Sequence, residues 1–267
     1  MMSPIKIVVS GAAGKMGQAV IKAVVQEEDL ELVGAADPVK AGFDAAALAG
    51  LEPRGVIIRE RLEEVLAETE AAVVIDFSTP LAVMENIHTA LKQRVAAVVG
   101  TTGITEDDLR QVESWVRQYE TGAIIAPNFS LGAVLMMKMA QICARYLPAV
   151  EIIECHHDGK IDAPSGTAIK TAQLIREANP CLEMEKEELE KVPGVRGGRV
   201  EGIPVHSVRL PGLVAHQQVI FGGNGQLLTL RHDSMDRSSF MPGLLLAVRR
   251  APGNKELIYG MENLIEL

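Results

Sequence analysis

The chain has 267 residues, of which 48% are hydrophobic and only 3% aromatic, and its formal net charge is −9 at pH 7. This length fits one large domain or two modest ones, with an aliphatic core of the kind that parallel strands form between helices. The negative charge argues against broad attraction to nucleic acid or anionic membranes, so we expect neither as a partner.

The first 128 residues alternate strand-like and helix-like segments. Strands are expected at residues 5–10, 30–36, 56–58, 72–76, 95–99 and 123–126. Helices are expected from a glycine turn to about residue 28, over about 60–68, from Pro80 to about 93, and from Thr105 to about 119. Pro80 would lie in a first helical turn, where a missing N–H is tolerated. This alternation predicts an α/β fold with a doubly wound parallel sheet of the Rossmann type.

The pattern changes after residue 128. We expect a helix over 131–146, a strand at 150–155, a helix from 165 to about 178, and a last helix from 237 to about 250 followed by a short tail. The charged stretch 183–201 is expected to have little secondary structure. Turn signals separate three further strand-like runs, at 203–210, 214–222 and 226–232, which predicts an antiparallel meander.

Two adjacent histidines and a lysine follow the strand expected at 150–155. The imidazoles of His156 and His157 titrate near neutrality, and Lys160 supplies a fixed charge for an anion or, when desolvated, a proton. The alternatives are a polar strand end and a metal site. Neighbouring strand residues point to opposite faces and no second Cys or His pair has a suitable spacing, so we do not expect a metal.

A helix start follows within a few residues. Ser165 stands at the expected N-cap, so the amides of Gly166 and Thr167 would point outward and hold a carboxylate or phosphate. We call this helix start, with the amides of Gly166 and Thr167, the anion cradle. A titrating imidazole, a lysine cation and the anion cradle together predict a pocket for a small acidic substrate that undergoes proton transfer.

A second candidate site is the turn Gly11-x-x-Gly14-x-x-Gly17, which lies between the first strand and the first helix. A dinucleotide pyrophosphate binds helix amides at such a position, and Asp37, at the end of the next strand, would accept hydrogen bonds from the ribose. The alternative is a tight turn that only serves helix–sheet packing. Residues 100–102 and 126–128 end later strands and would line the same crevice.

Three cysteines, at positions 143, 155 and 181, have no motif spacing, which favours a reducing compartment. The N-terminus has no signal-peptide layout, and no apolar run approaches the roughly 20 residues of a membrane helix. We therefore expect a soluble, cytoplasmic protein.

Both candidate sites match one family, because the sequence closely resembles the 4-hydroxy-tetrahydrodipicolinate (dihydrodipicolinate) reductases nearly end to end. The resemblance rests on Gly-Ala-Ala-Gly-Lys-Met-Gly (11–17), Ile-Asp-Phe-Ser (75–78), Gly-Thr-Thr-Gly (100–103), Ala-Pro-Asn-Phe-Ser (126–130), His-His-x-x-Lys-x-Asp-Ala-Pro-Ser-Gly-Thr-Ala (156–168), Arg-Leu-Pro-Gly (209–212) and His-Asp-Ser (232–234). It implies reduction of 4-hydroxy-tetrahydrodipicolinate to tetrahydrodipicolinate, with loss of water, by NAD(P)H in diaminopimelate and lysine biosynthesis.

The resemblance also implies roles for individual residues. His156 and Lys160 match the catalytic groups, and His157, Gly166 and Thr167 match contacts to a cyclic dicarboxylate substrate. The residues that match cofactor contacts are Gly11, Ala12, Ala13, Gly14, Lys15, Met16, Asp37, Gly100, Thr101, Thr102, Ala126, Pro127, Asn128 and Phe129.

The family architecture implies a dinucleotide-binding domain over residues 1–128, a substrate-binding and oligomerisation domain over 129–236, and a return of 237–267 to the first domain in a homotetramer. The chain departs from some members at Pro38, where they carry a basic residue that meets the NADP 2′-phosphate. The nearest remaining cations are Lys15 and Lys40, so we expect both cofactors to work, with NADH modestly preferred.

Two other interpretations stay open at this point. One is a different Rossmann oxidoreductase, acting on a sugar or an aldehyde, which would leave the Ser-Gly-Thr step unexplained. The other is a catalytically silent dinucleotide-binding sensor or scaffold, against which the presence of both His156 and Lys160 argues.

Overall fold

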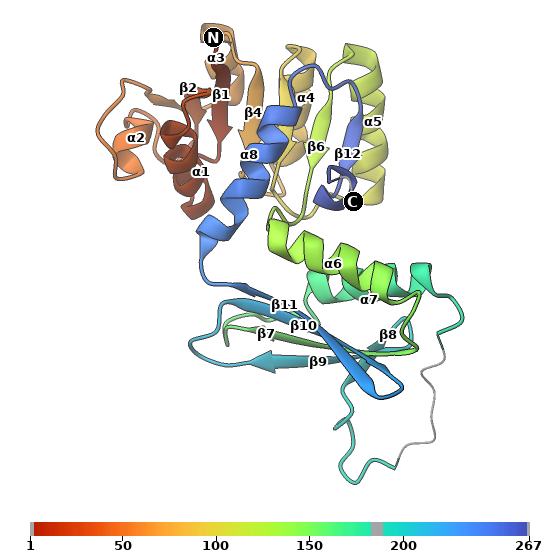
Figure 1. Cartoon of the computed structure of the whole chain (residues 1–267). Helices are drawn as coiled ribbons and strands as arrows, with labels where there is room; N and C mark the ends of the chain where they lie inside the picture. Colours follow the sequence, from red (N-terminus) through yellow and green to blue (C-terminus); the bar gives the residue numbers. More distant parts are fainter. Residues whose placement is uncertain (1–2, 183–188, 266–267) are drawn as a thin grey trace. The chain divides into compact units, whose positions relative to one another are not determined.

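The computed structural model describes residues 3–182 and 189–265 and divides the chain into two compact units. Unit 1 comprises Met1–Phe129 and Phe240–Glu266, and unit 2 comprises Ser130–Ser239. The chain therefore builds most of unit 1, forms unit 2, and then returns to unit 1 (Figure 1).

Unit 1 is built on a parallel sheet. Its strands lie in the order β12-β6-β5-β4-β1-β2-β3, and every pairing is parallel. The strands are β1 (Ile5–Ser10), β2 (Leu30–Ala36), β3 (Ile58–Arg59), β4 (Val73–Asp76), β5 (Ala96–Val99), β6 (Ala123–Ile125) and β12 (Leu257–Tyr259). The order reverses between β1 and β4, which is the topological switch point of a doubly wound sheet. The predicted fold class is confirmed.

Helices cover both faces of this sheet (Figure 1). They are α1 (Lys15–Gln26), α2 (Ala45–Leu48), α3 (Leu62–Glu68), α4 (Val83–Lys92), α5 (Glu106–Tyr119) and α8 (Met241–Arg250), the last preceded by the 3-10 turn η1 (Arg237–Phe240). Helices α1 and α8 pack together, as do α3 with α4 and α4 with α5. Strands β4 and β5 are buried along their whole length, as expected of aliphatic strands that lie between two layers of helices.

Unit 2 is a mixed sheet with two helices on one face. The strand order is β11-β10-β7-β9-β8, with β7 and β9 parallel and the other pairs antiparallel. The elements are α6 (Leu131–Cys143), β7 (Ala149–His156), α7 (Gly166–Ala178), β8 (Gly198–Val200), β9 (Ile203–Arg209), β10 (Ala215–Gly223) and β11 (Gln226–Ser234).

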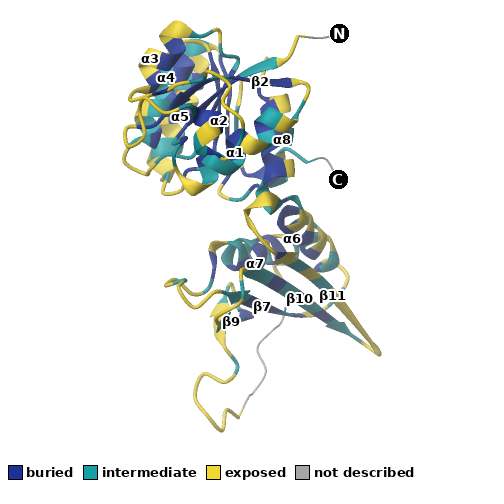
Figure 2. Ribbon diagram, turned by 90° about the vertical axis from the view of Figure 1, so that its left-hand side faces the viewer, coloured by how far each residue is buried: buried dark blue, intermediate teal, exposed yellow. Residues whose placement is uncertain are grey.

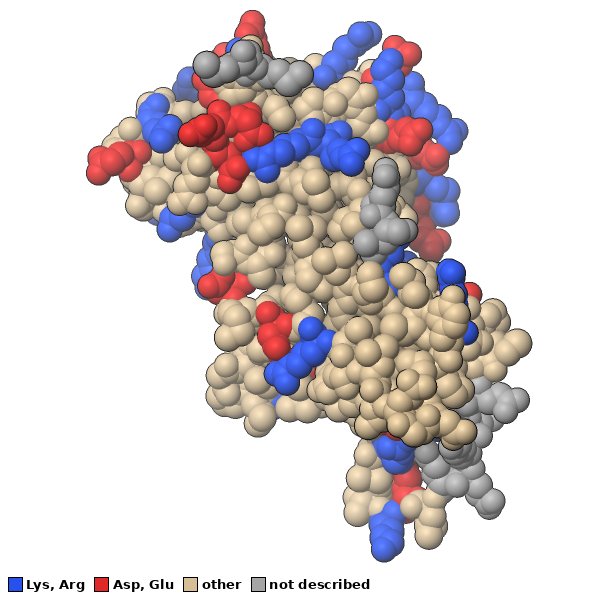
Figure 3. All heavy atoms as spheres, in the orientation of Figure 1, with Lys and Arg blue, Asp and Glu red and all other residues tan. Residues whose placement is uncertain are grey.

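The central strand β7 alternates between the two faces of this sheet. Val150, Ile152 and Glu154 are buried on the face that carries the helices, while Glu151 and Ile153 are only partly buried on the other. Figures 1 and 2 show α6 and α7 on one side of the sheet, and within the described residues no helix covers the opposite side. In the view of Figure 3, acidic and basic side chains are interspersed, without a large patch of one sign.

The antiparallel meander predicted for residues 203–232 is wrong in one pairing. Strands β10 and β11 form the expected hairpin, but β7 lies between β10 and β9 and pairs with both. The segment 210–214 passes the end of β7, where the Leu210 amide donates to the His156 carbonyl at 3.1 Å. Turn signals locate a reversal of the chain, but they do not select the strand beside which the next one lies.

Other differences are local. Helix α4 begins at Val83, because a turn in which the Ala82 and Val83 amides donate to the Thr79 carbonyl intervenes after Pro80. Within the charged stretch, residues 198–200 form β8, while residues 183–188 lie outside the described residues. The short helix α2 was not expected, and the tail contributes strand β12 to the sheet of unit 1.

Candidate active site

The glycine turn of unit 1 follows β1 at the switch point of the sheet. Gly11 has φ +74°, and a Cβ atom there would collide with the backbone of Phe77. A Cβ atom on Gly17 would collide with the Gly11 carbonyl and the Ala12 backbone. These two glycines let the turn and α1 pack closely, which the packing interpretation requires. The first amides of α1, like those of any helix, have no intrahelical acceptors, so the turn also meets the requirement for an anion site.

Asp37 holds this turn against the end of β2. Its Oδ2 atom accepts a hydrogen bond from the Ala13 amide at 3.0 Å, and its Oδ1 atom accepts one from the Val39 amide at 2.9 Å. Each carboxylate oxygen keeps further acceptor capacity for a ribose hydroxyl. A cavity of about 400 Å³ opens here, lined by residues that include Gly11, Gly14, Asp37 and Arg61. Arg61, the N-cap residue of α3, also lines this cavity, where its guanidinium forms an ion pair with Glu63 at 3.1 Å. No role for Arg61 was predicted from the sequence.

Asp76, at the end of β4, organises the neighbouring loops. It is 1% exposed and accepts hydrogen bonds from Thr101 Oγ1 at 2.6 Å, Ser78 Oγ at 2.8 Å and Asn86 Nδ2 at 2.8 Å. These bonds attach the 100–102 loop to β4 and α4. No role was predicted for Asp76 from its motif, because two of its three partners, Asn86 and Thr101, lie 10 and 25 residues further along the chain.

The expected cofactor residues gather at the carboxyl ends of the strands, but not all of them present a side chain to solvent. Ala126 is 1% exposed and Phe129 2% exposed, and the Phe129 ring packs 6.1 Å from that of Phe77. Thr101 directs its hydroxyl at Asp76, whereas Thr102 and Pro127 are exposed. The buried members therefore offer a ligand backbone groups at most, and their side chains belong to the core.

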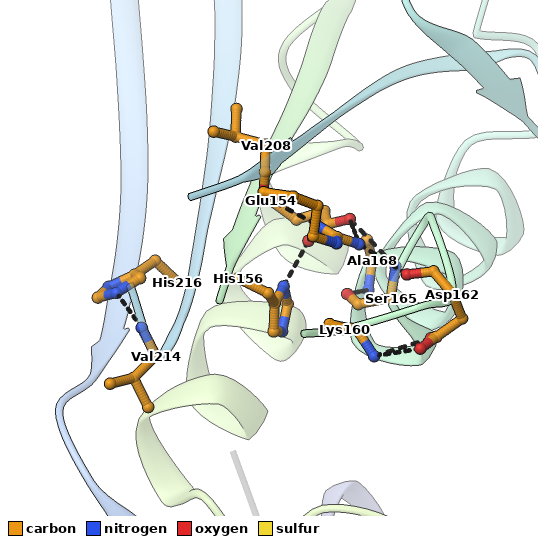
Figure 4. Close-up of polar contacts among 10 residues, drawn as sticks. Glu154, His156, Lys160, Asp162, Ser165, Ala168, Val208, Val214 and His216 are labelled. Carbon is orange, nitrogen blue, oxygen red and sulfur yellow. Dashed lines mark hydrogen bonds and ion pairs between the residues drawn. The ribbon is translucent and has the colours of Figure 1, made fainter. Parts of the chain in front are cut away.

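In unit 2, His156 lies at the end of β7 beside a buried ion pair (Figure 4). Its Nδ1 atom is 2.5 Å from Oε2 of Glu154, whose side chain is fully buried. Arg209, the last residue of β9, donates from Nη1 to Oε2 at 2.9 Å and from Nη2 to Oε1 at 2.8 Å. The Ser165 amide donates to Oε1 at 3.3 Å, so this carboxylate joins β7, β9 and the start of α7.

The charges around His156 oppose one another. Burial lowers the pKa of His156, its hydrogen bond with the Glu154 carboxylate raises it, and the positive charges of Lys160 and Arg209 lower it, so that it lies below the ordinary value. Burial raises the pKa of Glu154, but hydrogen bonds from Arg209, Ser207 and His156 outweigh burial and hold it below its usual range. The imidazole therefore sits beside an ionised carboxylate.

Lys160 lies in the loop that follows β7. Its amide donates to the His157 carbonyl at 3.1 Å, and its ammonium is 2.8 Å from each carboxylate oxygen of Asp162. Arg209 Nη2 also donates to the Asp162 carbonyl at 2.7 Å, which ties this loop to the buried ion pair. His157 is exposed, and it joins this network only through its backbone carbonyl.

The expected N-cap is confirmed at the start of α7, where Ser165 Oγ accepts a hydrogen bond from the Ala168 amide at 3.2 Å. Gly166 is exposed, and a Cβ atom added there would meet nothing within 4 Å. Thr167 is partly buried and its carbonyl accepts from Thr171 Oγ1 at 2.7 Å. A helix start with open space in front of it suits a carboxylate.

The structure thus brings His156, Lys160 and the start of α7 together around Glu154 and Arg209. No role was predicted from the sequence for Glu154 or Arg209. The signal for Glu154 was its place two residues before His156, on the same face of one strand. No comparable signal exists for Arg209, which reaches Glu154 from 55 residues away. In the described part of the chain, no group of three His, Cys, Asp or Glu side chains is arranged to hold a metal, and no helix is long and apolar enough to cross a membrane.

The fold and the switch-point site define a dinucleotide-binding oxidoreductase with a separate mixed-sheet unit. An amine dehydrogenase from Mycobacterium smegmatis shares this fold, with a TM-score of 0.69 at 14% identity over 99% of this chain and 97% of that one. Residues 5–129 match the family model described as dihydrodipicolinate reductase, N-terminus, and residues 132–265 match the model of its C-terminus. The chain belongs to the dihydrodipicolinate reductase family.

Close relatives support this assignment. The chain is 50% identical to the 4-hydroxy-tetrahydrodipicolinate reductase of Moorella thermoacetica over the full length of both. It is 49% identical to that of Desulfitobacterium hafniense (strain Y51) over 99% of this chain and 100% of the relative. The solved structure of a dipicolinate-bound dihydrodipicolinate reductase from Paenisporosarcina sp. TG-14 superposes with a TM-score of 0.87 at 45% identity, covering 98% of this chain and 100% of that one.

Proposed function

We propose that the chain reduces 4-hydroxy-tetrahydrodipicolinate to tetrahydrodipicolinate with NAD(P)H, releasing water, as a step of diaminopimelate and lysine biosynthesis. The observation that carries the proposal is the grouping of His156, Lys160 and the α7 start around one buried ion pair in a member of this family. The net reaction consumes one hydride and one proton and releases one water molecule.

The residues at the switch point fit a nicotinamide dinucleotide. Side chains on Gly11 and Gly17 would fill the space that the close turn needs, and Asp37 and the cavity lie at the ribose position. The candidate contacts are Gly11, Ala12, Ala13, Gly14, Lys15, Met16, Asp37, Gly100, Thr101, Thr102, Ala126, Pro127, Asn128 and Phe129. When bound, the cofactor supplies the hydride.

In unit 2, each group has a distinct task. The amides of Gly166 and Thr167 bind one substrate carboxylate, and the Lys160 ammonium binds acidic oxygens of the same substrate or supplies a proton. His156 exchanges a proton with the reacting ring of the substrate. His157, which is exposed, contributes a further contact to the substrate. A positioned general acid contributes typically about 10²–10⁴-fold to the rate.

The proposal is tested by the loss of NAD(P)H absorbance when the upstream synthase generates the substrate in situ. Oxidation that depends on the synthase and disappears in His156→Gln supports it. Turnover of a sugar or an aldehyde instead would favour a different oxidoreductase, and dinucleotide binding without turnover would favour a sensor.

For the cofactor, we propose that both NADH and NADPH serve, with NADH modestly preferred. The Asp37 carboxylate accepts from ribose hydroxyls and repels a 2′-phosphate. The offsetting cations are Lys15, Lys40, whose ammonium lies 5.2 Å from the Phe43 ring centre, and Arg61 in the cavity wall. Exposed charge pairs contribute only about 0.2–1 kcal/mol each, so discrimination should stay within roughly tenfold. A wild-type kcat/KM ratio that favours NADPH tenfold would contradict the proposal.

We also propose a homotetramer formed through the uncovered face of the unit 2 sheet. Ile153, Val208 and Ile220 lie on this face and are only partly buried in one chain. Apolar side chains gathered on an open face are typical of an interface. On this proposal the dinucleotide-binding domain comprises residues 1–128 and 237–267. The domain that binds the substrate and forms the tetramer comprises residues 129–236. Light scattering should give a mass of four chains, and a stable monomer at micromolar concentration would contradict the proposed tetramer.

The cytoplasmic location of the protein stays a prediction, which cell fractionation tests.

A further inference from the structure

The contacts of Glu154 determine where the imidazole of His156 carries its hydrogen. The Glu154 Oε2 atom lies 2.5 Å from His156 Nδ1, and an ionised carboxylate only accepts hydrogen bonds. The other neighbours of this carboxylate also donate hydrogen bonds to it: two guanidinium N–H groups of Arg209, the Ser165 amide and the Ser207 hydroxyl. A hydrogen on Nδ1 is therefore favoured in both the neutral and the protonated imidazole.

This arrangement leaves Nε2 as the atom available to a ligand. His156 has a side-chain exposure of 15%, and no hydrogen bond to Nε2 is found among the residues that the structure describes. With Nδ1 fixed, the neutral ring has its lone pair on Nε2 and the protonated ring has an exchangeable hydrogen there.

The same carboxylate also places the rest of the site. Its Oε1 atom accepts from the first amide of the α7 cap, and Arg209 reaches from Glu154 to the Asp162 carbonyl in the Lys160 loop. Figure 4 shows His156 Nδ1 and Ser165 at the start of α7 beside the Glu154 carboxylate. Glu154 therefore contacts His156 directly and reaches the Lys160 loop only through Arg209.

We propose that Glu154, clamped by Arg209, is a positioning residue that keeps one hydrogen of His156 on Nδ1 and leaves Nε2 to exchange a proton with the substrate. This inference rests on the proposed role of His156. Glu154 would determine the tautomer of the His156 imidazole, which can be measured without turnover.

The charged groups facing His156 set the expected direction of change. They are Glu154 on β7, Arg209 at the end of β9 and Lys160 in the loop, whereas β10 places Ala215 opposite and α7 contributes the neutral Ser165. The carboxylate raises the pKa of His156 and the two cations lower it. In Glu154→Gln the cations remain, so the pKa of His156 should fall further. A proton donor is lost as pH rises through its pKa, so the decline of kcat should move to lower pH.

The first measurement needs no variant. Nitrogen-15 chemical shifts of the histidine rings in the intact protein distinguish the two neutral tautomers, and His156→Gln assigns the signal among the six histidines. We expect the Nδ1–H form for His156. Finding the Nε2–H form in the wild-type protein would overturn the proposal, whatever happens to any variant.

The second measurement compares Glu154→Gln with two references. Glu154→Asp keeps the carboxylate and should recover part of the loss. Glu151→Gln is a matched control, because Glu151 lies on the same strand and contacts Arg196 at 2.5 Å and His206 at 2.8 Å on the opposite face. Glu154→Gln should mix the tautomers, lower the pKa of His156, and reduce kcat about tenfold to a hundredfold with little change in KM, as loss of an orienting partner typically does. Glu151→Gln should change none of these.

The outcomes separate this proposal from the function it rests on. If the tautomer and pKa of His156 are the same in Glu154→Gln and wild type, the positioning role is wrong, even if activity falls. If they shift as expected but His156→Gln retains turnover, Glu154 orients the ring and the proposed proton transfer by His156 is wrong.

Discussion

Strand β7 carries two clusters of the same composition on its opposite faces. On one face Glu154 contacts Arg209 and His156, and on the other Glu151 contacts Arg196 and His206. The distances are similar, but the Glu154 side chain is fully buried and that of Glu151 is 34% exposed. In the single chain, solvent reaches the Glu151 side chain and can replace its partners, whereas the Glu154 side chain has no access to solvent. The two clusters therefore differ in burial and not in residue type. The buried cluster around Glu154 can hold the His156 imidazole in one orientation, whereas the more exposed cluster around Glu151 only links two surface segments.

Stability should show the largest difference. Glu154→Ala leaves the Arg209 guanidinium, which is only 19% exposed, without its carboxylate. Breaking a fully buried pair typically costs about 3–5 kcal/mol, and we expect a loss somewhat below that range, whereas a more exposed pair such as Glu151–Arg196 is worth about 0–1 kcal/mol. Urea unfolding at one fixed protein concentration measures both variants. Equal losses would show that the two clusters do not differ in the way their burial implies.

The same pair predicts a pH dependence. The pKa of Glu154 is lower in the folded protein than its ordinary 4.5, so its stabilisation is fully present above that value and is lost as pH falls through the folded pKa. The pKa of His156 is also lowered, so the unfolded chain binds the extra proton and stability rises with pH up to about 6.5. Glu154→Gln should flatten the acid side of the stability profile, measured by urea midpoints between about pH 3 and pH 6. A curve parallel to wild type would exclude Glu154 as a source of the acid sensitivity.

The two clusters should also differ in catalysis, which is tested by replacing the histidine of each cluster, His156 or His206. His156→Gln should lower kcat at least about a hundredfold, as expected on removal of a general acid, while His206→Gln should leave it near wild type. Lys160→Ala should match His156→Gln, and nucleotide affinity should be nearly unchanged in all three variants. Retention of more than about a tenth of kcat by His156→Gln would refute its role.

The anion cradle should act on binding. A β-branched side chain in Gly166→Val would fill the open space in front of the α7 start, and Thr167→Val would alter its neighbour. Since the cradle holds the carboxylate in ground and transition states alike, both changes should mainly raise KM. Calorimetry with a planar pyridine dicarboxylate checks this directly, and Lys170→Ala, further along the same helix, serves as the control. Full affinity in both cradle variants would move the carboxylate site elsewhere.

The smallest effect is expected at Asp162. Its exposed carboxylate holds the Lys160 ammonium through both oxygens, so it competes with any substrate anion for that charge. Asp162→Asn should lower KM by a fewfold, within the roughly 0.2–1 kcal/mol of an exposed pair, while the exposed Asp158→Asn should not. Unchanged KM would mean that Lys160 can bind both anions at once.

Local signals predicted the local parts of this molecule well. Thr105 and Asp108 form the capping box that starts α5, and Ser165 caps α7, because each cap lies within three residues of its partner. The alternation of strands and helices sufficed for the doubly wound sheet. The insertion of β7 between β9 and β10 depends instead on pairing between distant strands, for which turn residues carry no signal.

The candidate sites divide in the same way. His156 and Lys160 were identifiable because they lie in one short run, and Asp37 because it ends the second strand. Arg209 and Arg61 were not assigned roles, because their contacts with these sites exist only after distant segments have folded together. Phe129 illustrates the reverse difficulty, since its motif indicates a ligand contact while its ring is buried.

The late return of the chain to unit 1 has a consequence for synthesis. Strand β12 hydrogen-bonds along the outer side of β6, so until residues 257–259 leave the ribosome, β6 is an unprotected edge. Unit 2 is translated in the interval, and the first unit cannot complete its sheet before the last part of the chain arrives. Chains that terminate prematurely would therefore present an apolar strand edge able to pair with other nascent chains, a typical start of aggregation.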